Sequence, residues 1–304
     1  MSSVVVALSA GATEVQIQNA LNGLPDGGTL ILAANQTVSV TKGLVLDVSS
    51  RSITFDLNGS TLQQAGDVSV LAVRGSHAAG QSGAIGHDPS GQVTVTTPGA
   101  APAAVVGDWV KLYSDSFLPN DQGAETRLGQ AMEVVGVQGN TLILKGELVD
   151  AEAYVDNIRV SKFVGGTPTI ENGTIRGDQS HQMWIKDLVN VRSTVDADLN
   201  HLTVRDGNSM GINIVDSVNA RITQVVAINL TDDTAAGHNG YAVHSASSVG
   251  TIFRRVLAVR HRAHRIVVGR VADLLGIEAL NAGADRTRRV HRIAIMPGGG
   301  IVGE

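Results

Sequence analysis

The side chains best suited to chemistry gather towards the end of the chain. Removing a proton from a carbon next to a carboxylate needs a cation on the carboxylate, a base, and an acid for the leaving oxygen. Arg260 could bind the carboxylate with two hydrogen bonds, with His261 or His264 as base and Tyr241 or His244 as acid. The alternative is that these side chains are solvated on an exposed sheet. The whole polar group comprises Asp232, Asp233, His238, His244, Arg260, His261, Arg262 and His264.

A set of carboxylates could support hydrolysis instead. Two carboxylates that flank a glycosidic bond can catalyse its hydrolysis, and the distance between them decides whether the anomeric configuration is retained or inverted. The candidates are Asp196, Asp198, Asp206, Asp232 and Asp233. Each also fits an ordinary turn, as in residues 206–208 and 231–234. The adjacent Asp232 and Asp233 could hold a calcium ion, so calcium stays open although neither chemistry requires a cofactor.

Six residues are predicted to contact a ligand around this machinery: Asp206, Asp232, Asp233, His238, Trp184 and Arg205. Trp184, expected on a short strand over 183–185, could be a stacking platform for a sugar ring or a half-buried packing residue.

The composition favours a β-rich fold. Aromatic residues make up 3% and charged residues 17% of 304 residues, whereas glycine occurs 35 times. Short Val/Ile strands separated by Gly, Asn and Asp are typical of solenoids. The chain has no cysteine, which excludes disulfides and thiolate metal sites. The net charge of −5 argues against a general nucleic-acid binder, and no segment has the length to span a bilayer.

A repeat becomes visible after residue 162. Residues 170–176 are echoed by 199–205, and the shape recurs at 222–228 and 253–260. The closing apolar residues, Ile175, Val204, Ile228 and Val259, lie 24 to 31 residues apart, with two shorter strands in each interval. Three strands per interval is the coil of a three-sided parallel β-helix, because a single coil cannot bury its apolar side chains whereas stacked coils can. Asparagines at strand ends are expected in left-handed corners: Asn172, Asn190, Asn219 and Asn229.

The repeat and its flanking segments predict an all-β chain. Residues 14–24 have helical spacing with Thr13 as N-cap, and this helix is expected to cap the stack. We expect 1–50 to form the cap and first coil, 51–82 the early coils, 83–163 an antiparallel insert or irregular coils, and 164–270 further coils. Residues 271–304 are atypical and basic. They indicate a truncated chain, a register altered from that of related chains, or a segment that caps the stack of coils and contacts an acidic partner.

These residues resemble the pectin-lyase-like right-handed parallel β-helix superfamily over nearly the whole chain. The resemblance rests on LPDGGTLILAANQTVSV, on the pattern I-x-N-G-T-I-R-G, on the GDWVKL…EVVGVQGNTLIL insert, and on the later coils. The opening is similar to that of phage tail-spike proteins. The D-P-H-E motif of mannuronan epimerases is missing, as are the calcium-binding nonapeptide repeats, and the paired Asp pattern of polygalacturonases is not evident.

The resemblance implies a carbohydrate-active protein acting on an acidic polysaccharide. We expect a polysaccharide lyase or C5-epimerase that abstracts the C5 proton of a uronate. The alternatives are a non-catalytic binding or tail-fibre module and a glycoside hydrolase. We expect a monomer or homotrimer without nucleic-acid or membrane partners. Residues 1–14 lack the basic region of a secretory signal, so an extracellular or virion-associated location is expected by a signal-free route.

Overall fold

The computed structural model describes residues 3–99, 103–119, 126–231 and 240–259, together with the backbone of 267–269, 274–279 and 300–301. The chain divides into two compact units. Met1–Gly75 and Gly165–Glu304 form the first, and Ser76–Val164 form the second, which is inserted between coils. The insertion begins earlier than the range 83–163 expected from sequence. Among the described residues, no helix has the length and apolar character needed to cross a bilayer.

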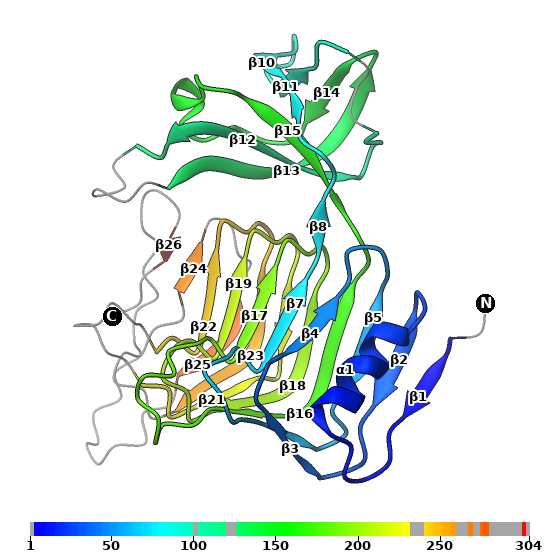
Figure 1. Ribbon diagram of the computed structural model, residues 1–304. Helices are drawn as coiled ribbons and strands as arrows, with labels where there is room; N and C mark the ends of the chain where they lie inside the picture. Colours follow the sequence, from blue (N-terminus) through cyan, green and yellow to red (C-terminus); the bar gives the residue numbers. More distant parts are fainter. Residues whose placement is uncertain are drawn as a thin grey trace, which may run out of the picture. The chain divides into compact units, whose positions relative to one another are not determined.

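The first unit is a right-handed parallel β-helix, in which each coil contributes three strand segments (Figure 1). The first face holds β2 (Gly28–Ile31), β5 (Ile53–Asp56), β20 (Arg221–Thr223) and the starts of β16 (Pro168–Arg176), β18 (Asp198–Arg205) and β23 (Ile252–Val259). The second face holds β3 (Thr37–Val40), β6 (Thr61–Gln64), β21 (Val226–Ile228) and the ends of β16, β18 and β23. The third face holds β4 (Leu44–Asp47), β7 (Leu71–Arg74), β17 (Val189–Arg192), β19 (Ile212–Val215), β22 (Val243–Ala246) and β24 (Val267–Gly269).

Strands at the two ends complete these sheets. β1 (Val5–Ala7) pairs with β2, and β25 (Leu274–Ala279) pairs in parallel with β23. β26 (Gly300–Ile301) pairs antiparallel with β24.

One residue in the left-handed region turns the chain between the first and second faces. Asn58, Asn172, His201, Gln224 and Arg255 occupy this corner in successive coils. Asparagine tolerates the conformation better than other non-glycine residues. Of the asparagines predicted at corners, Asn172, Asn219 and Asn229 have positive φ, whereas Asn190 lies inside β17.

The core consists of apolar ladders inside the coils. One ladder runs through six coils and is fully buried: Leu30, Phe55, Ile170, Leu199, Ile222 and Phe253. On the second face, Val204 stacks on Ala227, and not on Ile228 as the repeat spacing predicted. The inward-facing residue is the third residue after the left-handed corner, which is Ala227 after Gln224. The sequence spacing was counted to the apolar Ile228 instead, and the predicted register is therefore wrong by one residue. Such a shift moves a side chain to the opposite face.

The helix α1 (Glu14–Gly23) caps the first coil, as predicted. Thr13 and Gln16 form a capping box, and Ile17 and Leu21 are buried in the main core. Gln18 accepts a hydrogen bond from the backbone N–H of Val45 (2.8 Å) and donates one to its carbonyl (2.9 Å). The helix thereby satisfies backbone groups of β4 that would otherwise offer an open strand edge.

The second unit is an antiparallel β structure with its own core, which includes Val95, Val110, Leu112, Val134 and Leu142. The elements of this unit are β8 (Ser76–His77), β9 (Gln81–Ser82), β10 (Ala84–His87), β11 (Val93–Thr96), β12 (Trp109–Phe117), β13 (Arg127–Gln138), β14 (Thr141–Leu144), η1 (Ala151–Ala153) and β15 (Arg159–Val164). The hairpin predicted over 133–144 is formed by β13 and β14.

Candidate functional site

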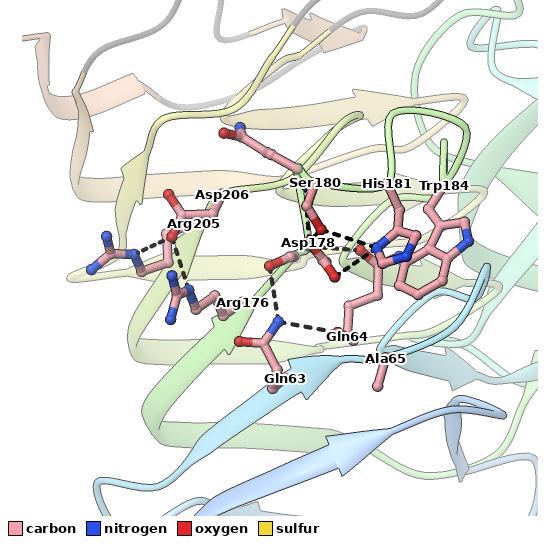
Figure 2. A pocket seen from close by; sticks show the side chains of 12 residues that line it. Gln63, Gln64, Ala65, Arg176, Asp178, Ser180, His181, Trp184, Arg205 and Asp206 are labelled. Carbon is pink, nitrogen blue, oxygen red and sulfur yellow. Dashed lines mark hydrogen bonds and ion pairs between the residues drawn. The ribbon is translucent and has the colours of Figure 1, made fainter.

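A groove of about 770 Å³ opens on the outside of the β-helix, where the second-face strands of three successive coils end. β6, β16 and β18 each contribute side chains, and the loop of residues 177–188 forms a wall (Figure 2). Its lining residues are Gln63, Gln64, Ala65, Arg176, Gly177, Asp178, Gln179, Ser180, His181, Trp184, Arg205 and Asp206.

Two arginines lie side by side in this groove because they occupy the same position in neighbouring coils. Arg176 of β16 pairs with Arg205 of β18 in parallel register. The Nε–H of each donates a hydrogen bond of 2.9 Å to the same atom, Oδ2 of Asp206. The contact uses only Nε, and the two side chains are 51% and 41% exposed. Both positive charges therefore face solvent in the groove while their orientation is fixed.

Asp206 is held in a left-handed corner directly after β18. Its Oδ1 accepts a hydrogen bond of 2.9 Å from Asn229, the corner residue of the next coil. Burial raises the pKa of Asp206, but hydrogen bonds from Asn229, Arg205 and Arg176 outweigh it, so the pKa lies below its ordinary value. Because both carboxylate oxygens have protein partners, Asp206 positions the two arginines.

A second charged pair stands on the loop wall. Oδ1 of Asp178 accepts hydrogen bonds from the backbone N–H (2.9 Å) and hydroxyl (2.5 Å) of Ser180. Its Oδ2 lies 2.8 Å from Nδ1 of His181. The hydrogen bond from Ser180 is the largest influence on the pKa of Asp178, which lies below its ordinary value. Asp178 is therefore a carboxylate at neutral pH and fixes the imidazole of His181.

The imidazole of His181 stacks on the indole of Trp184, with ring centroids 3.9 Å apart and planes 7° from parallel. Asn208 donates a hydrogen bond to the carbonyl of His181 (3.0 Å), and Gln64 accepts one from the backbone N–H of Asp178 (3.1 Å). Both ends of the loop are thus tied to neighbouring coils. Figure 2 shows the stacked rings on one side of Asp178 and the two arginines on the other.

Three residues predicted to contact a ligand, Trp184, Arg205 and Asp206, line the groove. Trp184 lies in the loop of residues 177–188, and the strand predicted over 183–185 is not formed. The other predicted residues with a binding or catalytic role in the terminal coils fall outside the described residues: Asp232, Asp233, His238, Arg260, His261 and His264.

Tyr241 and His244, the predicted acids, belong to a separate polar cluster on the third face. Nδ1 of His244 lies 2.9 Å from Oδ1 of Asn213, which in turn donates a hydrogen bond of 2.7 Å to Asp187. The ring of Tyr241 lies 5.8 Å from that of His244. Burial lowers the pKa of His244, although the charge of Asp187 partly opposes this. His244 is therefore a neutral, packed histidine at pH 7.

The sequence offered signals for residues that the prediction missed. Arg176 is one of them: it ends one of the two clearest copies of the repeat, as the predicted Arg205 ends the other, so equal repeat position places the two on adjacent strands. The spacing of Asp178, Ser180 and His181 is that of an Asx turn followed by a histidine, which brings a carboxylate to an imidazole. Within the residues that the structure describes, no group of three or more His, Asp or Glu could hold a metal ion.

No family model and no curated protein matches the chain, but solved structures do. The tailspike protein gp49 of Pseudomonas phage LKA1 superposes with a TM-score of 0.61 at 20% identity. The tailspike gp61 of Pseudomonas phage phi297 superposes with a TM-score of 0.55 at 16% identity. The chain shares the fold of these tailspikes. Each match covers 86% of this chain and 41% of the tailspike, so the chain spans about two-fifths of their length.

Proposed function

We propose that the chain is part of a phage tail module that binds an acidic polysaccharide in the groove and acts on it as a lyase or C5-epimerase. The observation that carries the proposal is the pair Arg176 and Arg205, fixed by Asp206 in the same groove as the stacked rings of His181 and Trp184.

The arginine pair matches the charge of a uronate. A planar guanidinium donates two parallel hydrogen bonds to a carboxylate, which a single lysine charge cannot do. Side chains paired across neighbouring strands lie about 5 Å apart, so Arg176 and Arg205 could share one carboxylate. The flat indole of Trp184 offers an apolar face to a sugar ring, as platforms in saccharide sites do.

Two arginines that bind one uronate carboxylate, called here the carboxylate clamp, favour chemistry at C5 of that uronate. Deprotonation of C5 moves negative charge onto the adjacent carboxylate, and fixed cations stabilise that charge as it develops. A lyase and an epimerase pass through the same carbanion. The first expels the oxygen at C4, and the second accepts a proton on the opposite face.

The carboxyl groups of the groove argue against hydrolysis as the main activity. A glycosidase needs one protonated carboxyl group, whose pKa is raised, to protonate the leaving oxygen. Asp178 and Asp206 both have a pKa below the ordinary value. Of the described aspartates predicted for hydrolysis, Asp196 and Asp198 do not line the groove.

The tailspike fold supports a virion-associated role, which agrees with the location expected from the sequence. The chain spans about two-fifths of the length of those tailspikes. Assembly into a homotrimer is therefore a further part of this proposal, and it has to be measured in solution. A binding module without activity is the competing candidate. It predicts saccharide binding without any change in the polymer.

The test is a panel of alginate, polygalacturonate and hyaluronate. Affinity is measured by calorimetry, unsaturated ends by ultraviolet absorbance, and inversion at C5 by NMR. We expect one polymer to bind and to acquire unsaturated ends or inverted C5 centres. Arg176→Ala and Arg205→Ala should each weaken binding about tenfold or more, the loss typical of one charge-assisted hydrogen bond. Arg221→Ala, an exposed arginine of the first face, is the matched control. If the polymers do not bind, or bind equally well to the groove variants, the proposal fails.

A further inference from the structure

The geometry points to His181 as the base that removes the C5 proton, with Asp178 as its positioning residue, and to β-elimination as the reaction that follows. This inference rests on the proposed function and deepens it, because it selects the lyase over the epimerase.

The hydrogen bonds around His181 decide which ring nitrogen can act. Nδ1 faces two oxygens, Oδ2 of Asp178 at 2.8 Å and the hydroxyl of Ser180 at 3.1 Å. The Ser180 hydroxyl also lies 2.5 Å from Oδ1 of Asp178, to which it donates. In the neutral ring the proton therefore belongs on Nδ1, and the lone pair is on Nε2. An Asp–His pair of this kind prepares a histidine as a general base.

The ring of His181 is also fixed in orientation. The indole of Trp184 stacks on one face, and the His181 carbonyl accepts hydrogen bonds from the Trp184 backbone (2.9 Å) and from Asn208 (3.0 Å). The side chain is nonetheless 53% exposed, so a polymer can approach it. A fixed but accessible base is what proton abstraction requires, since misplacement by about 1 Å can cost a hundredfold in rate.

The charged groups that share the groove are arranged around this base. Asp178 stabilises the imidazolium that forms, whereas Arg176 and Arg205 hold the substrate carboxylate, and Asp206 is neutralised by them. The other described side chains that line the groove around His181 are uncharged: Gln63, Gln64, Gln179, Ser180 and Trp184. Elimination needs one imidazole and the two cations, whereas an epimerase needs a second proton donor on the opposite face of the sugar, and these uncharged side chains supply none.

The step balances without water or a redox partner. Nε2 of His181 takes the C5 proton, and the C5–H electron pair becomes the C4=C5 double bond. The bond from C4 to the glycosidic oxygen breaks, and its electron pair leaves on that oxygen. The imidazolium then returns the proton to this oxygen. The products are a chain with an unsaturated uronate at its non-reducing end and a chain with a new reducing end.

His181→Gln tests the assignment, because it removes the base and keeps a polar side chain at an exposed position. On the polymer of the panel that the unaltered protein converts, we expect kcat to fall about 10²–10⁴-fold, the usual range for a general base, with the dissociation constant unchanged. Asp178→Asn should lower kcat with little change in KM, because the carboxylate acts only through His181. His87→Gln, an exposed histidine of the inserted unit, is the control and should leave kcat unchanged.

The other possible results distinguish an error in the assignment of His181 from an error in the proposed function. Full activity of His181→Gln, or loss of activity in His261→Gln while His181→Gln remains active, overturns the assignment and leaves the proposed function standing. Inversion at C5 without unsaturated ends overturns the choice of lyase. If the unaltered protein produces neither change, the proposed activity is overturned and the assignment with it.

Discussion

Arg176 and Arg205 are far apart in the chain but are direct neighbours in the parallel ladder, and their Nε atoms share one carboxylate oxygen of Asp206. Two like charges on adjacent strands repel, so this arrangement needs the anion between them. The same anion leaves the outer parts of both guanidinium groups directed to solvent. A structural repeat has thereby produced a site with two cations from one recurring position.

Asp206→Asn should destabilise the fold at neutral pH and remove part of its acid sensitivity. The pKa of Asp206 lies below its ordinary value of 3.8. A depressed folded pKa means that the carboxylate contributes stability above about pH 4, and that this contribution is lost as the pH falls through the folded pKa. We expect a lower Tm at pH 7 for the variant and a smaller gap from the unaltered protein below pH 3.8.

The control for that experiment is Asp67→Asn, which changes an exposed carboxyl group outside the groove. Melting curves between pH 7 and pH 3 provide the measurement. A constant difference in Tm between Asp206→Asn and the unaltered protein across this range would contradict the role assigned to Asp206.

His244 should make the fold less stable in mild acid. Burial lowers the pKa of His244 below its ordinary value of 6.5, so the unfolded chain takes up a proton before the folded chain does. The contribution is present above pH 6.5 and is lost as the pH falls through the lower folded pKa. His244→Gln, which can still donate to Asn213, should show a shallower fall of Tm between pH 7 and pH 5. An identical slope for the two proteins would argue against a buried, neutral His244.

Gly173→Ala should disrupt the stacking of the coils. A Cβ at Gly173 would meet Cβ of Leu57 at 2.4 Å and the carbonyl of Ser60 at 2.8 Å. Overpacking of this kind costs about 1–3 kcal/mol. Gly23→Ala is the comparison, since a Cβ at this last residue of α1 meets no atom within 4 Å. Denaturant titration should show a loss of stability for the first variant only, and equal stabilities would refute the close approach.

Trp184→Ala should weaken saccharide binding several-fold, because a stacked aromatic ring contributes about 0.5–1.5 kcal/mol beyond its buried area. Trp184→Phe should keep most of the affinity. Met183→Ala changes a neighbour that is 80% exposed and should have no effect. Calorimetry with the polymer that binds supplies the comparison, and equal affinity of Trp184→Ala and the unaltered protein would remove Trp184 from the binding surface.

The sequence predicted the coil, the capping helix and the inserted antiparallel unit because each follows from local patterns. Apolar alternation defines strands, Thr13 begins a helix, and Gly139-Asn140 closes a hairpin. The exact register did not follow, because Ile228 is apolar but faces outward beside Arg205, whereas small Ala227 fills the core. The position of the corner at Gln224 decides this, and glutamine carries no signal for a left-handed residue.

The residues that line the candidate groove follow from the sequence only in part, for a different reason. Trp184, Arg205 and Asp206 were selected by residue type, but the choice of catalytic residues followed the density of His and Arg along the chain. In a solenoid, proximity depends on equal position in successive coils, which joins Arg176 to Arg205. The loop of residues 177–188 brings Asp178 and His181 to the same groove through turn and tertiary hydrogen bonds. The pattern of residues within one strand carries no information about these contacts between coils and loop.

Binding of a substrate carboxylate by Arg176 and Arg205 can be tested by comparing an acidic polymer with its carboxyl-reduced form. Calorimetry would measure the binding of both forms to the unaltered protein and to the double variant Arg176→Ala, Arg205→Ala. We expect the unaltered protein to prefer the acidic form at least about tenfold, as is typical for a paired carboxylate, and the double variant to lose this preference. Equal affinity of the unaltered protein for the two forms, or an undiminished preference in the double variant, would contradict this expectation.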